Sequence, residues 1–443
     1  MAHNILLLQG PVGPFFRRFA RDLEKAGARV FKINFNGGDR LFFHGERCFD
    51  FDLPKDQWPL WLEKKITELN IDTIYLFGDC RHYHAVAREI APRLGVEVYV
   101  FEEGYLRPNY ITLERNGVNG HSGIVRQAEK YRRGKRLEKP ETHLRGSSFF
   151  HAALYAMAYY LAAAAQSGKF PHYEHHRPLK PVPEGLKWLR AGWRKIAYKV
   201  TERKYRRLLL GTQPPDFYLV ALQVHSDMQI RAHSSYDSIE AFIADCIRSF
   251  ANNAPAETLL VIKHHPMDRG YTDYSRAIRS IARQNGVAQR VIYVHDLNLP
   301  RLLRNTLGLV TVNSTVGLSA LLHGKPVKAM GNAIYDMPGL TTQKPLDEFW
   351  QAPTRVDIDL FERFRAWLHR NNQIKGNFYR RVTASGYHSG MILPELLKET
   401  VFKSHRQADN NADTTINDAS QKEIRRVNFE TIDTSPRQCR LYQ

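Results

Sequence analysis

The chain has 443 residues, 43% of them hydrophobic, which is enough to bury two cores and argues for two domains. Its formal net charge is +19, and its four scattered cysteines exclude a disulfide framework and fit a reducing cytoplasm. The first residues, MAHNILLLQG, lack a basic segment before the apolar run, so we expect no signal peptide.

The first elements follow the order of a nucleotide-binding α/β domain. Strands are predicted at 5–8, 28–35, 73–77 and 96–101, with helices at 15–26 and 83–94. The loop after the first strand, QGPVGP, is not a GxGxxG sequence, and no Walker lysine is present, so it is weak as a dinucleotide signature. We expect a tight turn near a site, because glycines permit close backbone approach.

Two carboxylates, Glu102 and Glu103, follow the strand at 96–101 and precede Gly104. Like charges side by side can raise the pKa of one carboxyl group, as general acid/base catalysis requires. The alternative is that one of them caps the next turn while the other is solvated.

Residues 121–210 carry 20 Lys and Arg against 6 Asp and Glu, which implies an anionic partner surface. The apolar block at 149–165 is shorter than the about 20 residues of a spanning helix, so we expect a buried or interfacial helix. From 169 to 210, aromatic and leucine residues are interleaved with Lys and Arg at roughly helical spacing. This pattern suits an anionic membrane surface; a nucleic-acid surface and an interdomain helix with a solvated face are the alternatives.

The second half repeats the strand–helix rhythm without repeating the sequence. Strands are predicted at 217–224, 259–262, 291–294, 308–312 and 326–330, with helices near 238–252, 274–285, 299–305 and 318–322. The polar composition of 405–443 predicts a disordered tail.

The run that ends in Lys263-His264-His265-Pro266 carries the strongest local signal of this half. Pro266 lacks an amide hydrogen and should end the strand, and ligands of open α/β sheets bind at the carboxyl ends of strands. On a strand, Lys263 and His265 would point one way and His264 the other. Such groups suit a phosphorylated ligand; a solvated strand end is the alternative.

Asn313, Ser314 and Thr315 follow another strand of this half and open a predicted helix. Small hydroxyl residues at such a position can expose backbone amides to an anion, although ordinary helix capping uses the same residues.

Six motifs in this order, GPVGPFF, NGGD, EEGYLRP, LQVHSD, KHHP and NSTVGLSALLHGKPV, resemble the capsule polysaccharide synthesis proteins of the KpsS type. These are bacterial retaining β-Kdo transferases, and the resemblance covers most of 5–397. It implies an α/β fold with two Rossmann-like domains facing across a cleft, the GT-B arrangement. It also implies CMP-Kdo as donor, a phosphatidylglycerol-type lipid as acceptor, and a place on the cytoplasmic face of the inner membrane as a peripheral protein.

Carried over, the resemblance assigns the donor site to Lys263, His265, Pro266, Asn313, Ser314 and Thr315. Retention by double displacement needs two carboxyl groups, which lie about 5–5.5 Å apart in retaining glycosidases. The resemblance assigns Asp227 as nucleophile and Glu103 as acid/base, with Glu102 in reserve; without it, a turn or helix cap would be the better reading of Asp227. Relatives often have aspartate where this chain has Glu103.

The remaining expectations concern the cleft, the membrane surface and the domains. We expect the acceptor side of the cleft to include Gly10, Gly13, Glu102, Arg107 and Gln223. Arg203, Lys204, Arg206 and Arg207 are expected to meet the anionic membrane. The predicted domains are 1–145, a helical membrane-contact segment 146–210, and 211–400, followed by the tail.

No Asp-x-Asp motif stands beside the predicted site, so we expect neither a metal nor a cofactor besides the donor substrate. Other capsule synthesis and export proteins are expected partners, and nucleic acid is not. Two other classes stay open: a non-catalytic capsule export or scaffold protein that binds nucleotide sugar or lipid, and a nucleic-acid-binding protein.

Overall fold

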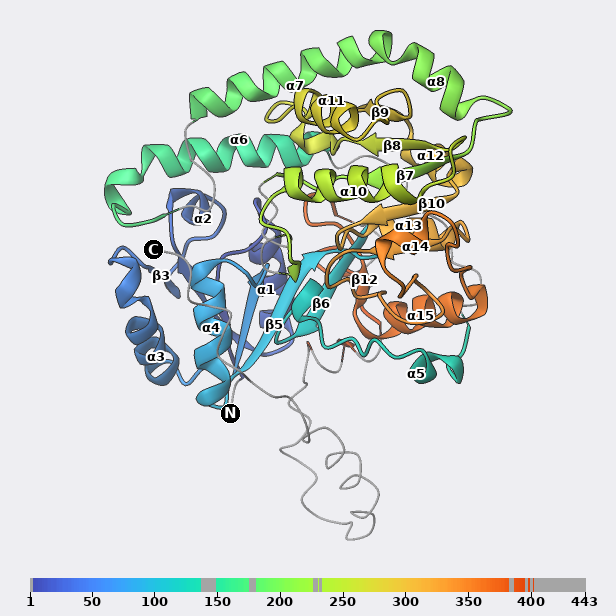
Figure 1. Cartoon of the computed structure of the whole chain (residues 1–443). Helices are drawn as coiled ribbons and strands as arrows, with labels where there is room; N and C mark the ends of the chain where they lie inside the picture. Colours follow the sequence, from blue (N-terminus) through green and yellow to red (C-terminus); the bar gives the residue numbers. More distant parts are fainter. Residues whose placement is uncertain are drawn as a thin grey trace. The chain divides into compact units, whose positions relative to one another are not determined.

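Two mostly parallel β-sheets organise the protein (Figure 1). The computed structural model describes residues 3–136, 149–174, 181–225, 230, 233–381, 386–394, 397–398 and 401. All of these lie in one compact unit, Met1–Lys403. The predicted disordered tail, 405–443, lies outside the described residues.

The first sheet has the strand order β12-β6-β5-β4-β1-β2-β3. Its strands are β1 (Asn4–Leu7), β2 (Arg29–Asn34), β3 (Cys48–Asp50), β4 (Thr73–Phe77), β5 (Glu97–Glu103), β6 (Tyr110–Arg115) and β12 (Gln373–Lys375). The first five strands are parallel and run 3-2-1-4-5 across the sheet, which is the Rossmann order. Strands β6 and β12 add an antiparallel edge.

The second sheet has the order β11-β10-β7-β8-β9, and all its pairs are parallel. Its strands are β7 (Phe217–Ala221), β8 (Leu259–Lys263), β9 (Val291–Val294), β10 (Gly308–Thr311) and β11 (Val327–Ala329). Read from β9, this is again the Rossmann order. The nearly continuous apolar runs, such as LLVI in β8, are typical of parallel strands that helices cover on both faces.

Three helices of the second half follow residues whose side chains accept a hydrogen bond from an amide of the first helical turn. Ser238, Asn298 and Asp357 each accept a hydrogen bond from a backbone amide three residues later. In the first half, the helices are α1 (Phe15–Lys25), α2 (Gly37–Phe42), α3 (Trp58–Glu68), α4 (His82–Arg93) and α5 (Glu129–Arg132). In the second half, they are α10 (Ile239–Asn253), α11 (Ser275–Gln284), α12 (Leu299–Asn305), α13 (Val316–Leu322), α14 (Leu346–Phe349) and α15 (Ile358–Asn371).

The predicted helical segment, which lies between β6 and β7 in the sequence, forms three helices (Figure 1). They are α6 (Phe149–Ala165), α7 (Pro181–Thr201) and α8 (Arg203–Leu210). Within the described part of the chain, no helix combines the length and hydrophobicity needed to cross a bilayer. The expectation that 149–165 is not a spanning helix agrees with this finding.

The C-terminal part of the described chain returns to the first sheet. After α15, strand β12 pairs antiparallel with β6, and Phe378, Met391 and Leu393 pack into the core beneath β1. We predicted that 211–400 would form the second domain. The return strand was missed because its three residues carry no pattern of their own and depend on pairing with β6.

The prediction of an α/β fold with two Rossmann-like sheets is confirmed. The predicted strands at 73–77 and 291–294 match β4 and β9, and the other predicted strands differ from the observed ones by a few residues at their ends. The hairpin of β5 and β6 was not predicted. The residues YITLER, which follow the motif EEGYLRP, form its second strand.

Candidate functional site

The carboxyl ends of β10, β7 and β8 lie side by side in the second sheet, and each is followed by a predicted site motif. The amide of Gln223, after β7, donates to Oδ1 of Asn313, after β10, at 2.9 Å. The backbone N–H of Asn313 donates back to Oε1 of Gln223 at 3.1 Å. This reciprocal pair spans the point where the strand order reverses, which is where open α/β sheets bind their ligands. Gln223, predicted for the cleft, thus lies beside the predicted donor residues.

Ser314 and Thr315 continue from this pair into α13, and both are partly exposed. The Ser314 hydroxyl accepts a hydrogen bond from the Val316 amide, and the Ser314 carbonyl accepts one from the Tyr335 hydroxyl at 2.6 Å. Tyr335 also packs so closely on Gly317 that a Cβ there would lie 2.1 Å from its hydroxyl oxygen. Tyr335 therefore holds the start of α13 in place.

The KHHP motif ends β8 and turns into a short 3-10 helix, η4 (Pro266–Asp268). Lys263 is buried, and its Nζ donates to the carbonyl of His295 at 2.9 Å. Burial lowers the pKa of Lys263 to about 8. Lys263 therefore ties β8 to the His295 loop, and its direct contact with a donor stays a prediction.

The two histidines of the motif, which follow the last residue of β8, differ in their surroundings. His264 is buried, with its Nδ1 2.6 Å from the Tyr293 hydroxyl. His265 is partly exposed, and its Nδ1 accepts from the Met267 amide at 3.2 Å. Burial lowers the pKa of His265 to about 4, so near neutral pH it is a neutral hydrogen-bonding group.

Asp268 links this motif to the loop after β7. It is fully buried, and its carboxylate accepts hydrogen bonds from the backbone N–H of His225 at 2.7 Å and from the Thr272 hydroxyl at 3.3 Å. Its other oxygen lies against Nδ1 of His225. The predicted nucleophile, Asp227, comes two residues after His225 and lies outside the described residues.

Removing this carboxylate is expected to destabilise the second sheet. Asp268→Ala removes the buried carboxylate that accepts from the His225 amide and the Thr272 hydroxyl, and it should lower the free energy of unfolding by about 2 kcal/mol, measured by urea denaturation. Asp237→Ala, at an exposed aspartate of the same half, is the matched control and should change stability little. Equal stability of the two variants would contradict the role given to Asp268.

Glu102 and Glu103 lie at the carboxyl end of β5, where their side chains alternate. Glu102 lies on the side of Gly78 and Asp79, and its Oε1 accepts from the Glu103 amide at 2.9 Å. Burial raises the pKa of Glu102 to about 7, and the neighbouring charges of Glu103 and Asp79 add to the rise. A carboxyl group that titrates near neutral pH is suited to proton transfer.

Glu103 lies beside Arg107 and Tyr379. The Glu103 Oε2 is 3.9 Å from an Arg107 nitrogen, and the Tyr379 hydroxyl donates a hydrogen bond to the carboxylate. Burial raises the pKa of Glu103, and these two partners oppose the rise. The charge of Arg107 also lowers the pKa of His265 in the second half. Arg107 thus pairs directly with Glu103, and its charge also acts on His265.

Gly10 and Gly13, predicted for the cleft, lie in a packed loop after β1. A Cβ on Gly10 would lie 2.8 Å from the Phe16 ring, and one on Gly13 would lie 2.9 Å from the Tyr155 ring of α6. They line a small cavity of about 20 Å³, which has room for about one water molecule. Both glycines therefore serve close packing, and their contact with an acceptor stays a prediction.

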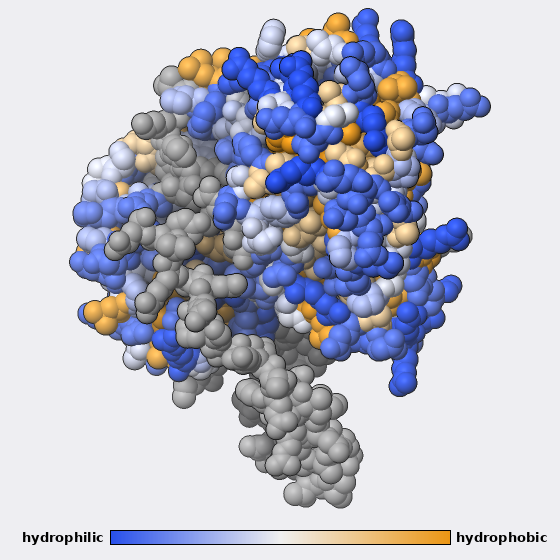
Figure 2. All heavy atoms as spheres, viewed as in Figure 1, coloured by the Kyte–Doolittle hydropathy of each residue, from blue (hydrophilic) through white to orange (hydrophobic). Residues whose placement is uncertain are grey.

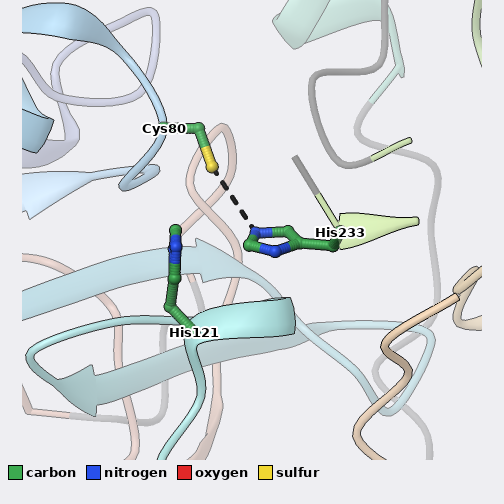
Figure 3. A group of neighbouring side chains, drawn as sticks. All are labelled: Cys80, His121 and His233. Atoms are coloured by element: carbon green, nitrogen blue, oxygen red, sulfur yellow. Dashed lines mark hydrogen bonds between the residues drawn. The ribbon is translucent and has the colours of Figure 1, made fainter. Parts of the chain in front are cut away.

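Cys80, His121 and His233 form a cluster that joins the two halves (Figure 3). The Cys80 Sγ lies 3.7 Å from Nε2 of His233, and the two imidazole rings are 4.4 Å apart and nearly perpendicular. Behind them, buried Asp79 accepts from His121 at 3.1 Å. Although burial opposes it, this bond and one from the Val118 amide hold the pKa of Asp79 at about 2.

This cluster contains donor atoms that Zn²⁺ prefers, all within 4.8 Å of one another. Three donors leave a tetrahedral set incomplete, and the Cys80 thiol donates to the Asp79 carboxylate at 3.2 Å. Burial raises the pKa of the Cys80 thiol, so the protonated form fits this position. We assign no metal to the cluster, and its evident role is to hold His233 against the first half.

Sequence reasoning missed the residues that support the carboxylates. Asp79, Cys80 and Arg81 follow β4 as the sequence GDCR, and their place at a strand end was the signal that could have revealed them. Arg81 donates to the Gln9 side chain at 2.9 Å. Tyr379 offered no such signal, because it reaches Glu103 from the far end of the chain.

The predicted membrane residues lie on α8. Arg203, Lys204 and Arg207 are exposed, and Arg206 is partly exposed and donates to the Lys199 carbonyl at 3.4 Å. Their contact with a membrane stays a prediction.

Comparisons with known proteins identify the family. The model of the capsule polysaccharide biosynthesis protein family matches residues 72–379. The chain is 43% identical to the capsule polysaccharide export protein KpsS of Escherichia coli over 375 residues, or 84% of this chain and 96% of that one. It is 40% identical to the capsule polysaccharide modification protein LipB of Neisseria meningitidis serogroup B over 389 residues, covering 86% of this chain and 93% of that one.

A search of solved structures matches KpsC of Thermosulfurimonas dismutans, described as a beta Kdo 2,7 transferase, with a TM-score of 0.44 and 14% identity over 91% of this chain and 98% of that one. The sequence matches decide the assignment: the chain belongs to the capsule polysaccharide biosynthesis protein family.

Proposed function

We propose that this capsule polysaccharide biosynthesis protein is a retaining transferase that moves Kdo from CMP-Kdo to a phosphatidylglycerol-type lipid and so starts the glycolipid anchor of a capsule. The observation that supports it best is the ion pair of Arg107 with Glu103 at the end of β5, together with the charge of Arg107 acting on His265 of the predicted donor motif.

The donor is placed at the second sheet. The cytidine monophosphate group would lie over the reversal point between β7 and β10, near Asn313, Ser314 and Thr315. His265, neutral near pH 7, would donate a hydrogen bond to the nucleotide or accept one from it. Arg107, whose side chain is more than half exposed, would supply the positive charge that a phosphate or a sugar carboxylate requires.

The reaction proceeds in two displacements at one carbon. The Asp227 carboxylate attacks the anomeric carbon of Kdo, the bond to the phosphate oxygen breaks, and CMP leaves with the bonding electrons. The acceptor hydroxyl then attacks the same carbon, the bond to Asp227 breaks, and a glutamate at the end of β5 takes the hydroxyl proton. Two inversions retain the anomeric configuration, and no step needs a metal.

The acceptor places the protein at a membrane. A lipid with acyl chains must be reached at the bilayer surface, and a charged nucleotide sugar is supplied from the cytoplasm, so we place the protein on the cytoplasmic face of the inner membrane. A non-catalytic role in capsule export is the second candidate, which the name of the Escherichia coli relative, capsule polysaccharide export protein, favours.

A single assay separates these two functions. The full-length protein is incubated with CMP-Kdo and a fluorescent lysophosphatidylglycerol in the presence of EDTA, and the lipid is analysed by mass spectrometry. We expect a product with one added Kdo, at the same rate with and without EDTA. Absence of product under both conditions would favour the export role. Loss with EDTA and recovery with Zn²⁺ would contradict the metal-free mechanism and point to Cys80, His121 and His233.

A further inference from the structure

Helices α6 and α7 each carry a row of large apolar side chains that face away from the protein. On α7, the row consists of Leu186, Leu189, Trp193, Ile196 and Val200; we call it the α7 stripe. On α6, it consists of Phe150, Leu154, Met157 and Leu161, the α6 stripe. Intervals of three and four residues place each row on one helix face. Leu189 is 73% exposed and Trp193 is 69% exposed, although both belong to residue types that proteins usually bury.

The opposite face of α7 is fixed to the second half by specific contacts. The Arg194 guanidinium donates to the Arg269 carbonyl at 2.9 Å, and the Tyr198 ring stacks on His295 at 3.9 Å. A Cβ on Gly270 would lie 2.3 Å from the Lys187 carbonyl oxygen, so the helix backbone sits directly on the loop after η4. The α7 stripe therefore faces outward, because the opposite side of the helix packs against the loop that follows the donor motif.

Helix α6 is fixed to the first half in the same way. The Tyr159 hydroxyl lies within hydrogen-bond distance of Gln9, Asn36 and Asp39, all buried. A Cβ on Gly37 would lie 2.3 Å from the Ala162 carbonyl oxygen, so the glycines of NGGD let α6 pack on α2. Helices α6 and α7 contact each other. Each half of the protein thus holds one helix whose outer face is apolar.

Basic side chains border the α7 stripe. Arg190 lies on one side of it, and Lys195 and Lys199 lie on the other, all three exposed. Figure 2 shows hydrophobic side chains in orange beside hydrophilic ones in blue along the upper edge, where α7 runs in Figure 1. No acidic residue is exposed between Leu186 and Val200. An apolar row bordered by cations is the arrangement of helices that lie in the headgroup region of anionic bilayers.

We propose that the α6 and α7 stripes are a bilayer-docking surface, and that its occupant is an anionic phospholipid membrane into which the apolar side chains insert while the bordering cations meet headgroups. This inference deepens the proposed location and rests on the lipid acceptor proposed above. It differs from binding by α8 charges alone, because hydrophobic insertion supplies part of the affinity. Since α7 sits on the loop after the donor motif, docking would bring the membrane next to the donor site.

Vesicle sedimentation tests this surface with matched variants of the full-length protein. The vesicles are phosphatidylcholine with or without phosphatidylglycerol. Replacing Leu189, Trp193 and Ile196 together by glutamine should weaken binding to the anionic vesicles at least about a hundredfold, because each inserted side chain contributes about tenfold. Leu60→Gln, at a leucine of α3 that is 74% exposed, is the control and should bind like the unmodified protein.

The charged border is tested by replacing Arg190, Lys195 and Lys199 together by glutamine. We expect about a hundredfold weaker binding at low salt and little further loss at high salt, since each of the three cations near the surface contributes about fivefold. Circular dichroism and thermal unfolding establish that each variant is folded; all substituted side chains are exposed.

Three outcomes would overturn the docking surface: no vesicle binding by the unmodified protein, unchanged binding by the apolar variant, or equal losses in that variant and Leu60→Gln. The first would leave a protein partner as the occupant. Transfer by the unmodified protein to a short-chain lysophosphatidylglycerol below its micelle concentration is measured in parallel. Failure of that reaction would count against the proposed enzyme, whereas failure of vesicle binding alone would count only against the docking surface.

Discussion

Substituting asparagine for Asp227 is expected to abolish Kdo transfer while leaving the binding of CMP largely intact. The amide keeps the size of the side chain but cannot attack the anomeric carbon, so the covalent step is lost. Removal of an enzymatic nucleophile lowers kcat by several orders of magnitude, and we expect a loss of at least about a thousandfold. The measurement is the initial rate with a saturating lipid acceptor, with CMP affinity determined by calorimetry.

The matched control is Asp237→Asn, at an exposed aspartate in the same half. It should transfer Kdo at the rate of the unmodified protein. A non-catalytic export protein predicts that Asp227→Asn changes nothing in a capsule assay. Transfer at more than about a tenth of the normal rate would exclude Asp227 as nucleophile.

The proposed donor side of this site was accessible from the sequence because parallel sheets align the carboxyl ends of their strands. Once the strands before His265 and Asn313 were recognised, their place on one edge followed from the α/β pattern, and β10, β7 and β8 are indeed neighbours. The motifs are local, and each follows directly on an apolar run. What the pattern did not determine was the burial of Lys263 behind that edge, which depends on the His295 loop.

The proposed acceptor side was less accessible because its contacts join distant parts of the chain. Tyr379 reaches Glu103 only because β12 returns to β6, and His233 reaches Cys80 only because the two halves touch. The apolar stripes were hidden for another reason. The sequence predicts amphipathic helices here. Which face of each helix points outward depends on the contact of Tyr159 with Asn36 and of Tyr198 with His295.

The raised pKa of Glu102 has a consequence for stability that does not depend on catalysis. In the unfolded chain the pKa of a glutamate is about 4.3, and burial in the folded protein raises the pKa of Glu102 to about 7. The folded state therefore favours the protonated form. That contribution is fully present below about pH 4.3 and is lost as the pH rises through about 7. Glu102→Gln, which stays neutral, should raise Tm by a few degrees at pH 8 and leave it unchanged at pH 4.

The second large effect concerns the proton acceptor of the transfer step. The resemblance assigns it to Glu103, while the electrostatics make Glu102 equally suited. Replacing the residue that acts as base by glutamine should lower kcat by about 10²–10⁴-fold, because the acceptor hydroxyl then keeps its proton. The first displacement needs no base, so the Kdo–enzyme ester should accumulate on Asp227 and appear as a mass increase of one Kdo residue in the intact protein.

Comparison of Glu102→Gln and Glu103→Gln identifies the base, since each variant is the control for the other. The base must be deprotonated to act, so kcat/KM for the acceptor should rise with pH through its pKa and become independent of pH in the variant that lacks it. A rise centred near pH 7 that disappears only in Glu102→Gln would transfer the role from Glu103 to Glu102. If neither variant accumulates the ester and both keep the pH profile, double displacement assisted by this strand end is wrong. The pair of Glu103 and Arg107 would then serve donor binding alone.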